Sequence, residues 1–491
     1  MAKLWLNEDN SHYFMTRAER AADPREIRDF IMQYKGSNVE RFFLCANCQK
    51  TNFPTEAGDI IFKDVTEEQL DKNDRPLFTN WCHAVRNITD KEIDIYSIWI
   101  ELLREIGISP WMSMRMNDVH NAQDTADLIH NSFYKNNLNY RRAMHRDEKW
   151  EDRQLNYLIK DVQDYHFALL TEYFEKYDFD GIELDWMRFG NHFPVGYEDT
   201  GREVLNQFMK NTKDLSLKFE KIRGHKIEIA ARVPIKPETA YDMGMDGVGW
   251  ALAGYVDCLI PSPFWHTSQE DIPVERWKRQ VLGTECKIAP CIEICLRQYA
   301  FPKCKNKFQL NSIETMRGPA VSFIDRGADA IYLFNYMDEQ RFAYENSSYN
   351  DIISEIGNYE LMQKSTKRYV LTFNDRRPEG TLSDERLPFS LEKGVFAGFR
   401  LHTGNLQEKN QRLALLSFKG KGKIDPAQIS IYVNSVKCGF KGEYDSGNPK
   451  PVDTLYAWEI ALSAYKDGYQ VIEAVADVDG YTIDWVEILI C

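Results

Sequence analysis

The sequence of 491 residues is long enough for two or three domains with substantial cores. Its content of 43% hydrophobic and 28% charged residues is that of an ordinary folded protein and excludes a globally disordered chain. A net charge of −14 argues against nucleic acid or an anionic membrane as a partner, and no apolar run reaches the ~18 residues of a membrane span.

The first residues, MAKLWLN, lack the apolar core of a signal peptide. We therefore expect a cytoplasmic protein, or a secreted or periplasmic one whose leader has been removed. Among the ten cysteines, Cys45 and Cys48 form a C-x-x-C without the second pair that a zinc site needs. Reduced, structural thiols and no bound metal or organic cofactor are the expectation.

In chain order, short apolar stretches alternate with amphipathic ones through the first three quarters of the sequence. Helices are predicted at 24–34, 66–70, 89–107, around 158–173, at 200–222 and from Ser312 onward, and a long polar loop at 118–150. For the helix at 89–107, Thr89 is the predicted N-cap, with Glu92 three residues on and Gly107 at the end. Strands are predicted at 4–6, 39–46, 108–117, within 177–189, and at 226–233, 256–261, 287–294 and 330–335.

Eight such strand–helix units predict a closed (β/α)8 barrel over residues 1–365. The alternative, an open doubly wound sheet, requires a glycine-rich phosphate-binding turn after an early strand, and the sequence has none. After residue 366 the pattern becomes short, alternating, turn-separated strands, which predicts an all-β sandwich over residues 366–491.

The fourth predicted strand, in the segment YDFDGIELDWMRF at 177–189, carries two acids. Alternate residues of a strand point the same way, so Glu183 and Asp185 share one face while Ile182 and Leu184 share the other. A parallel strand with a purely structural role is apolar on both faces, and two buried acids are costly unless they line a polar cavity. The pair therefore indicates a site.

Barrel sites lie at the C-terminal ends of the strands. Asp185, Glu293 and Glu183 are the predicted catalytic carboxyls, since glycoside hydrolysis needs a protonated acid and an ionised partner. An ion pair with Arg297 is the alternative for Glu293. The predicted substrate-binding residues are those that end or follow the other strands: Arg115, Asn117, Arg188, Arg232, Trp265, His266, Asn335, Glu8 and Asn47. For His266 a packed position at the rim is equally open, and Trp485 is expected in a core.

The segment at 177–189 resembles the fourth-strand signature of glycoside-hydrolase-like (β/α)8 proteins, in the broad form DGI-x-LD-x-x-R. It is similar to the chitinase-type DG-x-D-x-D-x-E, but Met187 stands where that pattern has its catalytic glutamate, which argues against a chitinase-type substrate-assisted mechanism. Barrels of the α-glycosidase type carry an aspartate nucleophile on strand four, a role that would fit Asp185.

The resemblance implies a hydrolase that acts on a poly- or oligosaccharide. Two alternatives stay open. One is a non-catalytic glycan-binding barrel, and the other is a metal-dependent hydrolase or lyase that uses Glu8, Asp9, Asp118 and Asp185.

Overall fold

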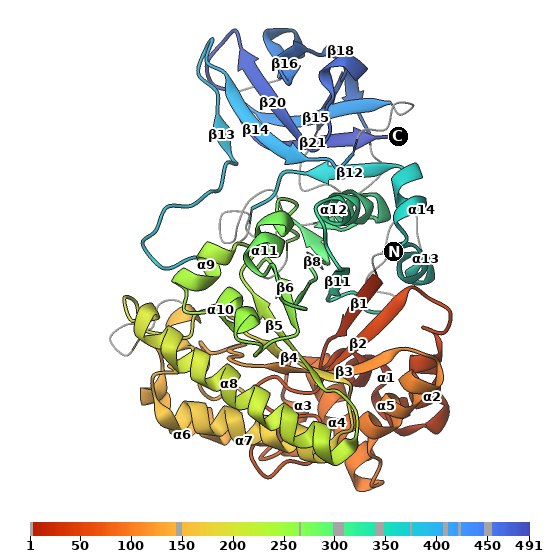
Figure 1. Cartoon of the computed structure of the whole chain (residues 1–491), viewed down its shortest axis with the longest axis vertical. Helices are drawn as coiled ribbons and strands as arrows, with labels where there is room; N and C mark the ends of the chain where they lie inside the picture. The colour runs from red at the N-terminus through yellow and green to blue at the C-terminus, as the bar shows by residue number, and fades with distance from the viewer. Residues whose placement is uncertain are drawn as a thin grey trace.

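A computed structural model of the chain describes residues 3–143, 150–264, 267–297, 309–338, 348–373, 376–405, 411–420, 424–445 and 454–491. Strands and helices alternate up to α14 (Tyr359–Lys364), and the remainder, drawn in blue at the top of Figure 1, is built of β-strands. Within the described ranges, no helix is both long and apolar enough to cross a membrane.

A parallel sheet forms the centre of the first part. Its strands are β1 (Lys3–Glu8), β2 (Val39–Cys45), β3 (Ser109–Arg115), β4 (Gly181–Asp185), β5 (Glu228–Val233), β6 (Cys258–Pro261), β7 (Lys287–Ile288), β8 (Cys291–Glu293) and β11 (Ala330–Phe334). β7 pairs with β6 and β8 with β11, and the two are pieces of one strand interrupted at Ala289 and Pro290. Backbone bonds continue through the interruption, since Ala289 N donates to Leu259 O at 3.0 Å and Pro290 O accepts from Tyr332 N at 3.1 Å. Because β11 also pairs with β1, the sheet closes, and the predicted eight-stranded barrel is confirmed.

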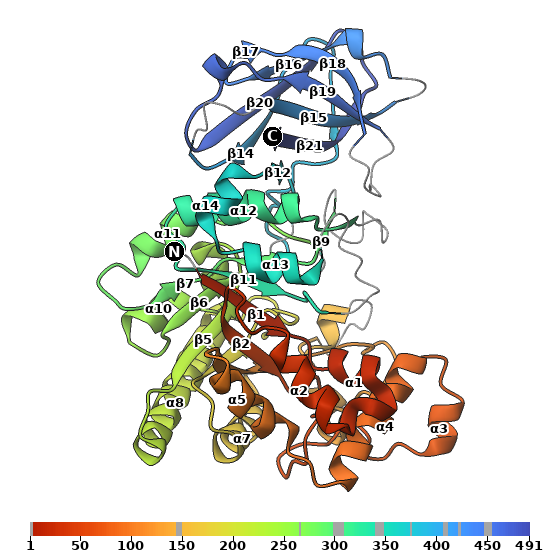
Figure 2. The same ribbon diagram turned by 90° about the vertical axis from the view of Figure 1, so that its right-hand side faces the viewer.

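Helices connect the barrel strands and cover the outside of the barrel (Figures 1 and 2). They are α1 (His12–Arg17), α2 (Pro24–Met32), α3 (Glu67–Asp71), α4 (Pro76–Asp90), α5 (Ile95–Glu105), α6 (Ser132–Asn136), α7 (Lys160–Lys176), α8 (Glu198–Arg223), α9 (Pro237–Asp242), α10 (Gly247–Leu252), α11 (Val274–Gln280) and α12 (Ile313–Asp325), followed by α13 (Tyr349–Glu355) and α14. A small hairpin of β9 (Cys295–Leu296) and β10 (Gln309–Leu310) precedes α12.

The predicted N-cap of the helix at 89–107 is wrong. Thr89 belongs to the last turn of α4, where its hydroxyl donates to Val85 O at 2.8 Å. The next helix, α5, begins at Ile95, and its N-cap is Asp94, whose carboxylate accepts from Ser97 N at 3.2 Å. An aspartate with a free acceptor is as good a cap as threonine, and here the chain uses it to start a second helix.

Aromatic side chains and one arginine fill the lower part of the barrel interior. Trp5, Phe43, Trp111 and Tyr332 belong to an apolar cluster inside the barrel, and Arg41 lies between the rings of Trp5 and Trp111, 4.3 and 4.4 Å from their centroids. A Cβ on Gly181 would lie 2.6 Å from the Trp111 ring, so glycine is what allows this indole to fill the space beside β4. The lower barrel is therefore filled by aromatic side chains packed around the buried Arg41.

The C-terminal part consists of two antiparallel sheets, as predicted. The larger contains β12 (Lys367–Val370), β21 (Thr482–Ile490), β15 (Arg412–Lys419), β19 (Leu455–Glu459) and β18 (Gly439–Tyr444), with β13 (Phe389–Ser390) paired to β21. The smaller contains β14 (Ala397–His402), β20 (Tyr469–Ala476), β16 (Ile429–Val433) and β17 (Val436–Lys437). The buried side chains of both sheets share one apolar cluster.

The larger sheet is buried on its second face as well. Trp485 packs there with Val370, Leu415 and Leu296, the last of which comes from the barrel hairpin β9, so the prediction that Trp485 is a core residue is confirmed. α14 ends at Lys364 and β12 begins at Lys367, next to the predicted boundary at 365/366, although the division into independent domains stays a prediction.

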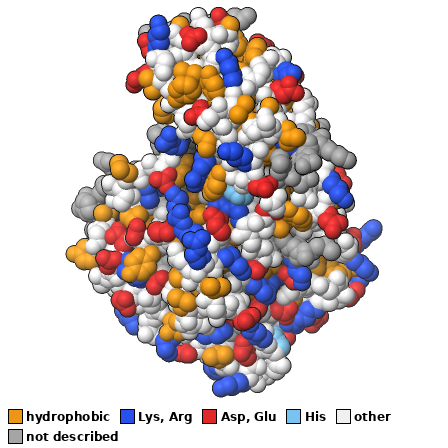
Figure 3. Space-filling view, turned by 45° about the horizontal axis from the view of Figure 1, so that its top comes forward, with side chains coloured by type: hydrophobic (Ala, Val, Ile, Leu, Met, Phe, Trp, Pro, Cys, Tyr) orange, Lys and Arg blue, Asp and Glu red, His pale blue; other side chains and the backbone are white. Residues whose placement is uncertain are grey.

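Acidic and basic side chains are mixed over the face shown in Figure 3, with Lys and Arg side chains gathered in its middle beside a histidine.

Candidate active site

The end of β4 places two carboxylates inside the barrel. Ile182 and Leu184 belong to the cluster between the sheet and the helices, so Glu183 and Asp185 face the interior, as their shared face predicted. Their side chains are 0% and 1% exposed. Carboxylates this deeply buried need specific partners, and both have them.

Three donors hold Asp185. Its Oδ1 accepts the backbone N–H groups of Met187 at 3.0 Å and Arg188 at 2.8 Å, and its Oδ2 accepts Arg232 Nη1 at 2.6 Å. Arg232 comes from the register position beside Asp185 on β5, and its guanidinium lies 3.8 Å from the centroid of the Phe334 ring. The Asp185 carboxylate is thus fixed in orientation and has a buried counter-charge.

Glu183 lies one layer deeper. Its two oxygens accept Ser113 Oγ from β3 at 2.7 Å and Tyr332 OH from β11 at 2.5 Å. Burial, and next the neighbouring Asp185 charge, raise the pKa of Glu183 from 4.5 to about 7. Glu183 therefore holds a proton near neutral pH more readily than an ordinary glutamate does.

Glu293 ends β8, on the other side of the barrel. Its Oε1 accepts Asn335 Nδ2 at 2.6 Å and its Oε2 accepts Cys295 N at 3.1 Å. In register it stands beside Phe334, the residue on whose ring Arg232 packs. Glu293 is therefore at the same level of the barrel as the Asp185–Arg232 pair. Asn335, which orients it, has a left-handed backbone with φ 64°.

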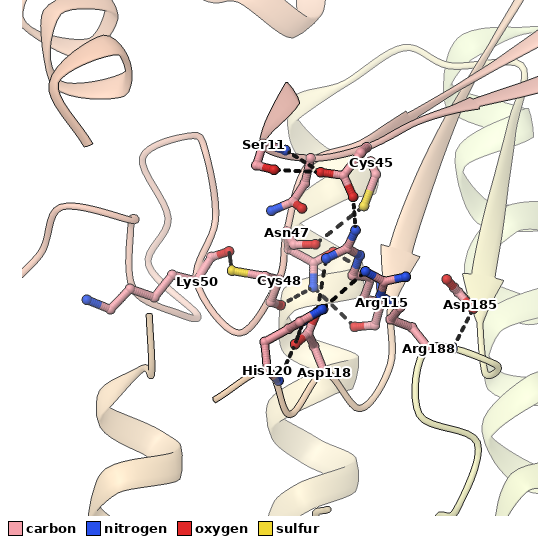
Figure 4. A network of polar contacts seen from close by, with 12 residues as sticks. Ser11, Cys45, Asn47, Cys48, Lys50, Arg115, Asp118, His120, Asp185 and Arg188 are labelled. Carbon is pink, nitrogen blue, oxygen red and sulfur yellow. Dashed lines mark hydrogen bonds and ion pairs between the residues drawn. The ribbon is translucent and has the colours of Figure 1, made fainter. Parts of the chain in front are cut away.

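Arg115, at the end of β3, is the centre of a polar network shown in Figure 4. Its guanidinium pairs with Asp9 and, at 3.0 Å, with Asp118. Burial by itself raises the pKa of Asp118, but His120 and Arg115 outweigh burial and hold that pKa well below its usual range. His120 Nδ1 lies 2.6 Å from Asp118, and its Nε2 lies 3.2 Å from Arg188 Nη2.

Two of the predicted binding residues hold the backbone. The Asn47 amide donates to Arg115 O at 3.1 Å and accepts Arg115 N at 3.1 Å, which ties the end of β2 to β3. Asn117 donates to Leu155 O and accepts Leu155 N, both at 2.9 Å, so it closes the long loop between β3 and α7. These contacts use the polar atoms of both side chains.

Glu8, at the end of β1, pairs with His12, which in turn lies 3.1 Å from Asp338. Burial lowers the pKa of His12, but Glu8 and Asp338 outweigh burial and raise it to about 9. Arg17 also pairs with Asp338, at 2.8 Å. Glu8 thus belongs to a buried ion-pair network between β1 and the end of β11.

The carboxylates of the metal-dependent alternative do not converge. Asp9 and Asp118 pair with Arg115, Asp185 pairs with Arg232, and Glu8 pairs with His12. Over the part of the chain that the structure describes, no group of three or more His, Cys, Asp and Glu side chains could hold a metal ion. The predicted binding residues Trp265 and His266 lie outside the described residues.

Several site residues were missed in the sequence. Tyr332 follows from the alternation of AIYLFN, which puts it on the same face as Phe334, but its partner Glu183 is 149 residues away. Ser113 carries no signal beyond its strand position. His12, His120 and Asp338 stand just after strands, where polar side chains of a barrel gather.

No family model and no curated protein matches this chain. Among solved structures, the glycoside hydrolase domain of PgaB (BpsB) from Bordetella bronchiseptica is 10% identical with a TM-score of 0.41, over 72% of this chain and 99% of that chain. The GH36 α-galactosidase AgaB from Geobacillus stearothermophilus is 11% identical with a TM-score of 0.36, over 97% of this chain and 55% of that chain. The α-L-fucosidase isoenzyme 1 from Paenibacillus thiaminolyticus is 9% identical with a TM-score of 0.34, over 96% of both chains. The chain thus spans little more than half the length of AgaB, and because the TM-scores of these three structures are below 0.5, the function must be argued from the site itself.

Proposed function

We propose that this protein is a glycoside hydrolase that cleaves a poly- or oligosaccharide at the C-terminal mouth of its barrel. The observation that carries the proposal is the Asp185 carboxylate, which faces inward at the end of β4 and is oriented by two backbone N–H groups and the buried Arg232. Barrel enzymes use residues at this end of the strands for catalysis, and a preorganised carboxylate is what an oxocarbenium-like transition state requires.

Hydrolysis of a glycosidic bond needs a second carboxyl. Asp185 is assigned as the ionised nucleophile or base. Both of its oxygens accept hydrogen bonds, from two backbone N–H groups and from the positively charged Arg232, and such donors stabilise a carboxylate. Glu293 is assigned as the general acid, because it stands at the level of the Asp185–Arg232 pair. Glu183 is enclosed by Ser113 and Tyr332 one layer below, so it is assigned neither of the two catalytic roles.

The experiment that tests this proposal is hydrolysis of a broad panel of oligosaccharides and aryl glycosides by the wild type, Asp185→Asn and Glu293→Gln. Loss of three or more orders of magnitude in kcat by Asp185→Asn, and of about 10²–10⁴ by Glu293→Gln, with glycan binding kept, supports the two-carboxyl mechanism. The matched control is Glu238→Gln on α9, an exposed glutamate paired with Arg276. If the wild type cleaves nothing while all variants bind glycans equally, the protein is a glycan-binding barrel and the mechanism is refuted.

A further inference from the structure

A cavity of about 450 Å³ lies beside the Asp185 turn, between the ends of β1 and β3 and the start of α4. This volume is in the range of small-molecule sites, roughly 300–1,000 Å³. Arg115, His120 and Arg188 contribute polar groups to its lining, and Met15, Leu77, Phe78 and Ile129 contribute apolar surface. Leu77 is 40% exposed, so part of the apolar surface is open to a ligand.

The charges of the lining are opposite in sign to those of the protein as a whole. The chain carries a net charge of −14, yet the charged lining residues are the three arginines Arg75, Arg115 and Arg188 and the single carboxylate Asp9. The lining itself therefore carries more arginines than carboxylates, while Asp118 and Asp127, which pair with Arg115 and Arg75, are not part of it.

Two of the three arginines already have carboxylate partners. Arg75 pairs with Asp127 at 3.1 Å, and Arg115 pairs with both Asp9 and Asp118. Arg188 differs. Its side chain forms no ion pair with any of the described residues, and its Nε is buried without a hydrogen-bond partner among them, although the residue is only 8% exposed.

The one side-chain hydrogen bond of Arg188, to His120, also defines which ring nitrogen of His120 carries the proton. A guanidinium only donates, so the 3.2 Å contact makes His120 Nε2 the acceptor and leaves the ring proton on Nδ1, which donates to Asp118. His120 thus positions the Arg188 guanidinium without neutralising it. Asp9, Asp118 and Asp185 act on the Arg188 charge without forming an ion pair with it, but its Nε–H stays unpaired within the described residues, and a ligand acceptor that meets this group removes the cost of leaving it buried without a partner.

We propose that this cavity binds the carboxylate of an acidic sugar, with Arg188 as the residue that recognises it. A guanidinium with unused N–H groups matches a planar carboxylate, and the apolar surface of Met15, Leu77 and Phe78 suits the C–H face of a sugar ring. Arg188 follows Asp185 by three residues, and its backbone N–H is bonded to the Asp185 carboxylate, so the acidic unit occupies a position next to the reaction centre. The inference rests on the proposed function and specifies its substrate as a uronate-containing glycan.

Calorimetric titration of the whole protein with glucuronate, glucose, glucose 6-sulfate and inorganic sulfate tests the inference. We expect glucuronate to bind at least tenfold more tightly than glucose, and Arg188→Gln to lose at least tenfold in affinity for glucuronate. Arg188→Lys keeps the charge without the planar guanidinium, and its affinity for glucuronate is expected to lie between those of the wild type and Arg188→Gln. The control is Arg28→Gln, a half-exposed arginine that pairs with Glu105 on the outer helices and is expected to bind as the wild type does.

Equal affinity for glucuronate and glucose, or unchanged glucuronate binding by an Arg188→Gln variant with wild-type melting temperature, would overturn the inference. Equal or tighter binding of the two sulfate-bearing probes would also overturn it, since the site would then be one for tetrahedral anions. Hydrolysis and titration of the wild type together separate this inference from the proposed function. A wild-type protein that binds glucuronate but hydrolyses no glycan refutes the hydrolase and keeps the acidic-sugar site, and a wild-type protein that hydrolyses glycans without binding glucuronate does the reverse.

Discussion

The buried ion pair of Asp185 and Arg232 allows the loss of unfolding free energy in an Arg232 variant to be predicted. Both side chains are almost completely buried, and at 2.6 Å with an effective dielectric of about 20 their attraction is about 6 kcal/mol, most of which is offset by the loss of hydration. Arg232→Met keeps the length of the side chain against the Phe334 ring but leaves Asp185 without a counter-charge. We expect this variant to lose about 3–5 kcal/mol of unfolding free energy.

The assay is urea unfolding of the wild type, Arg232→Met, Asp185→Asn and the double variant, analysed as a double-mutant cycle. Because the double variant removes both charges, its loss should be smaller than the sum of the single losses by about 1–3 kcal/mol. Arg276→Met is the surface control, since Arg276 forms an exposed pair with Glu238 at 3.1 Å and should cost less than about 1 kcal/mol. The reasoning is refuted if Arg232→Met costs no more than this control, or if the cycle is additive within about 0.5 kcal/mol.

Two further stability predictions concern β4. Because the pKa of Glu183 is raised in the folded state, its contribution to stability is present below about pH 4.5 and is lost as the pH rises through about 7. Glu183→Gln lacks this titration, so its unfolding free energy relative to wild type should improve between pH 5 and pH 8, and a constant difference would contradict the shift. Gly181→Ala places a Cβ 2.6 Å from the Trp111 ring and should cost about 1–3 kcal/mol in thermal unfolding. Gly398→Ala, where the added Cβ meets nothing within 4 Å, should be neutral or stabilising, and equal effects of the two would show that the close contact is not responsible.

Regular patterns explain what could be predicted from the sequence. The two-residue period of β4 placed Glu183 and Asp185 on the inner face, and apolar runs located all eight barrel strands. α4 was missed even though Phe78, Trp81, Cys82 and Val85 have helical spacing.

Partners distant in sequence could not be predicted. Arg115 pairs with Asp9, 106 residues away, and Tyr332 bonds to Glu183 across 149 residues. Only closure of the barrel brings such strand ends together, and a single sequence does not show which end faces which. For the same reason the absence of an ion pair at Arg188, among the described residues, is visible only in the structure.

The central claim is that the Asp185 carboxylate is the reacting group of the site. Its most direct test is the turnover number of Asp185→Asn on the best substrate of the wild type, measured at a temperature at which unfolding curves show both proteins to be folded. The asparagine oxygen can still accept the N–H groups of Met187 and Arg188, so the turn is retained while the charge is lost. The account predicts a loss of at least about 10³-fold in kcat. A variant that keeps its fold and turns over within tenfold of the wild type would contradict it.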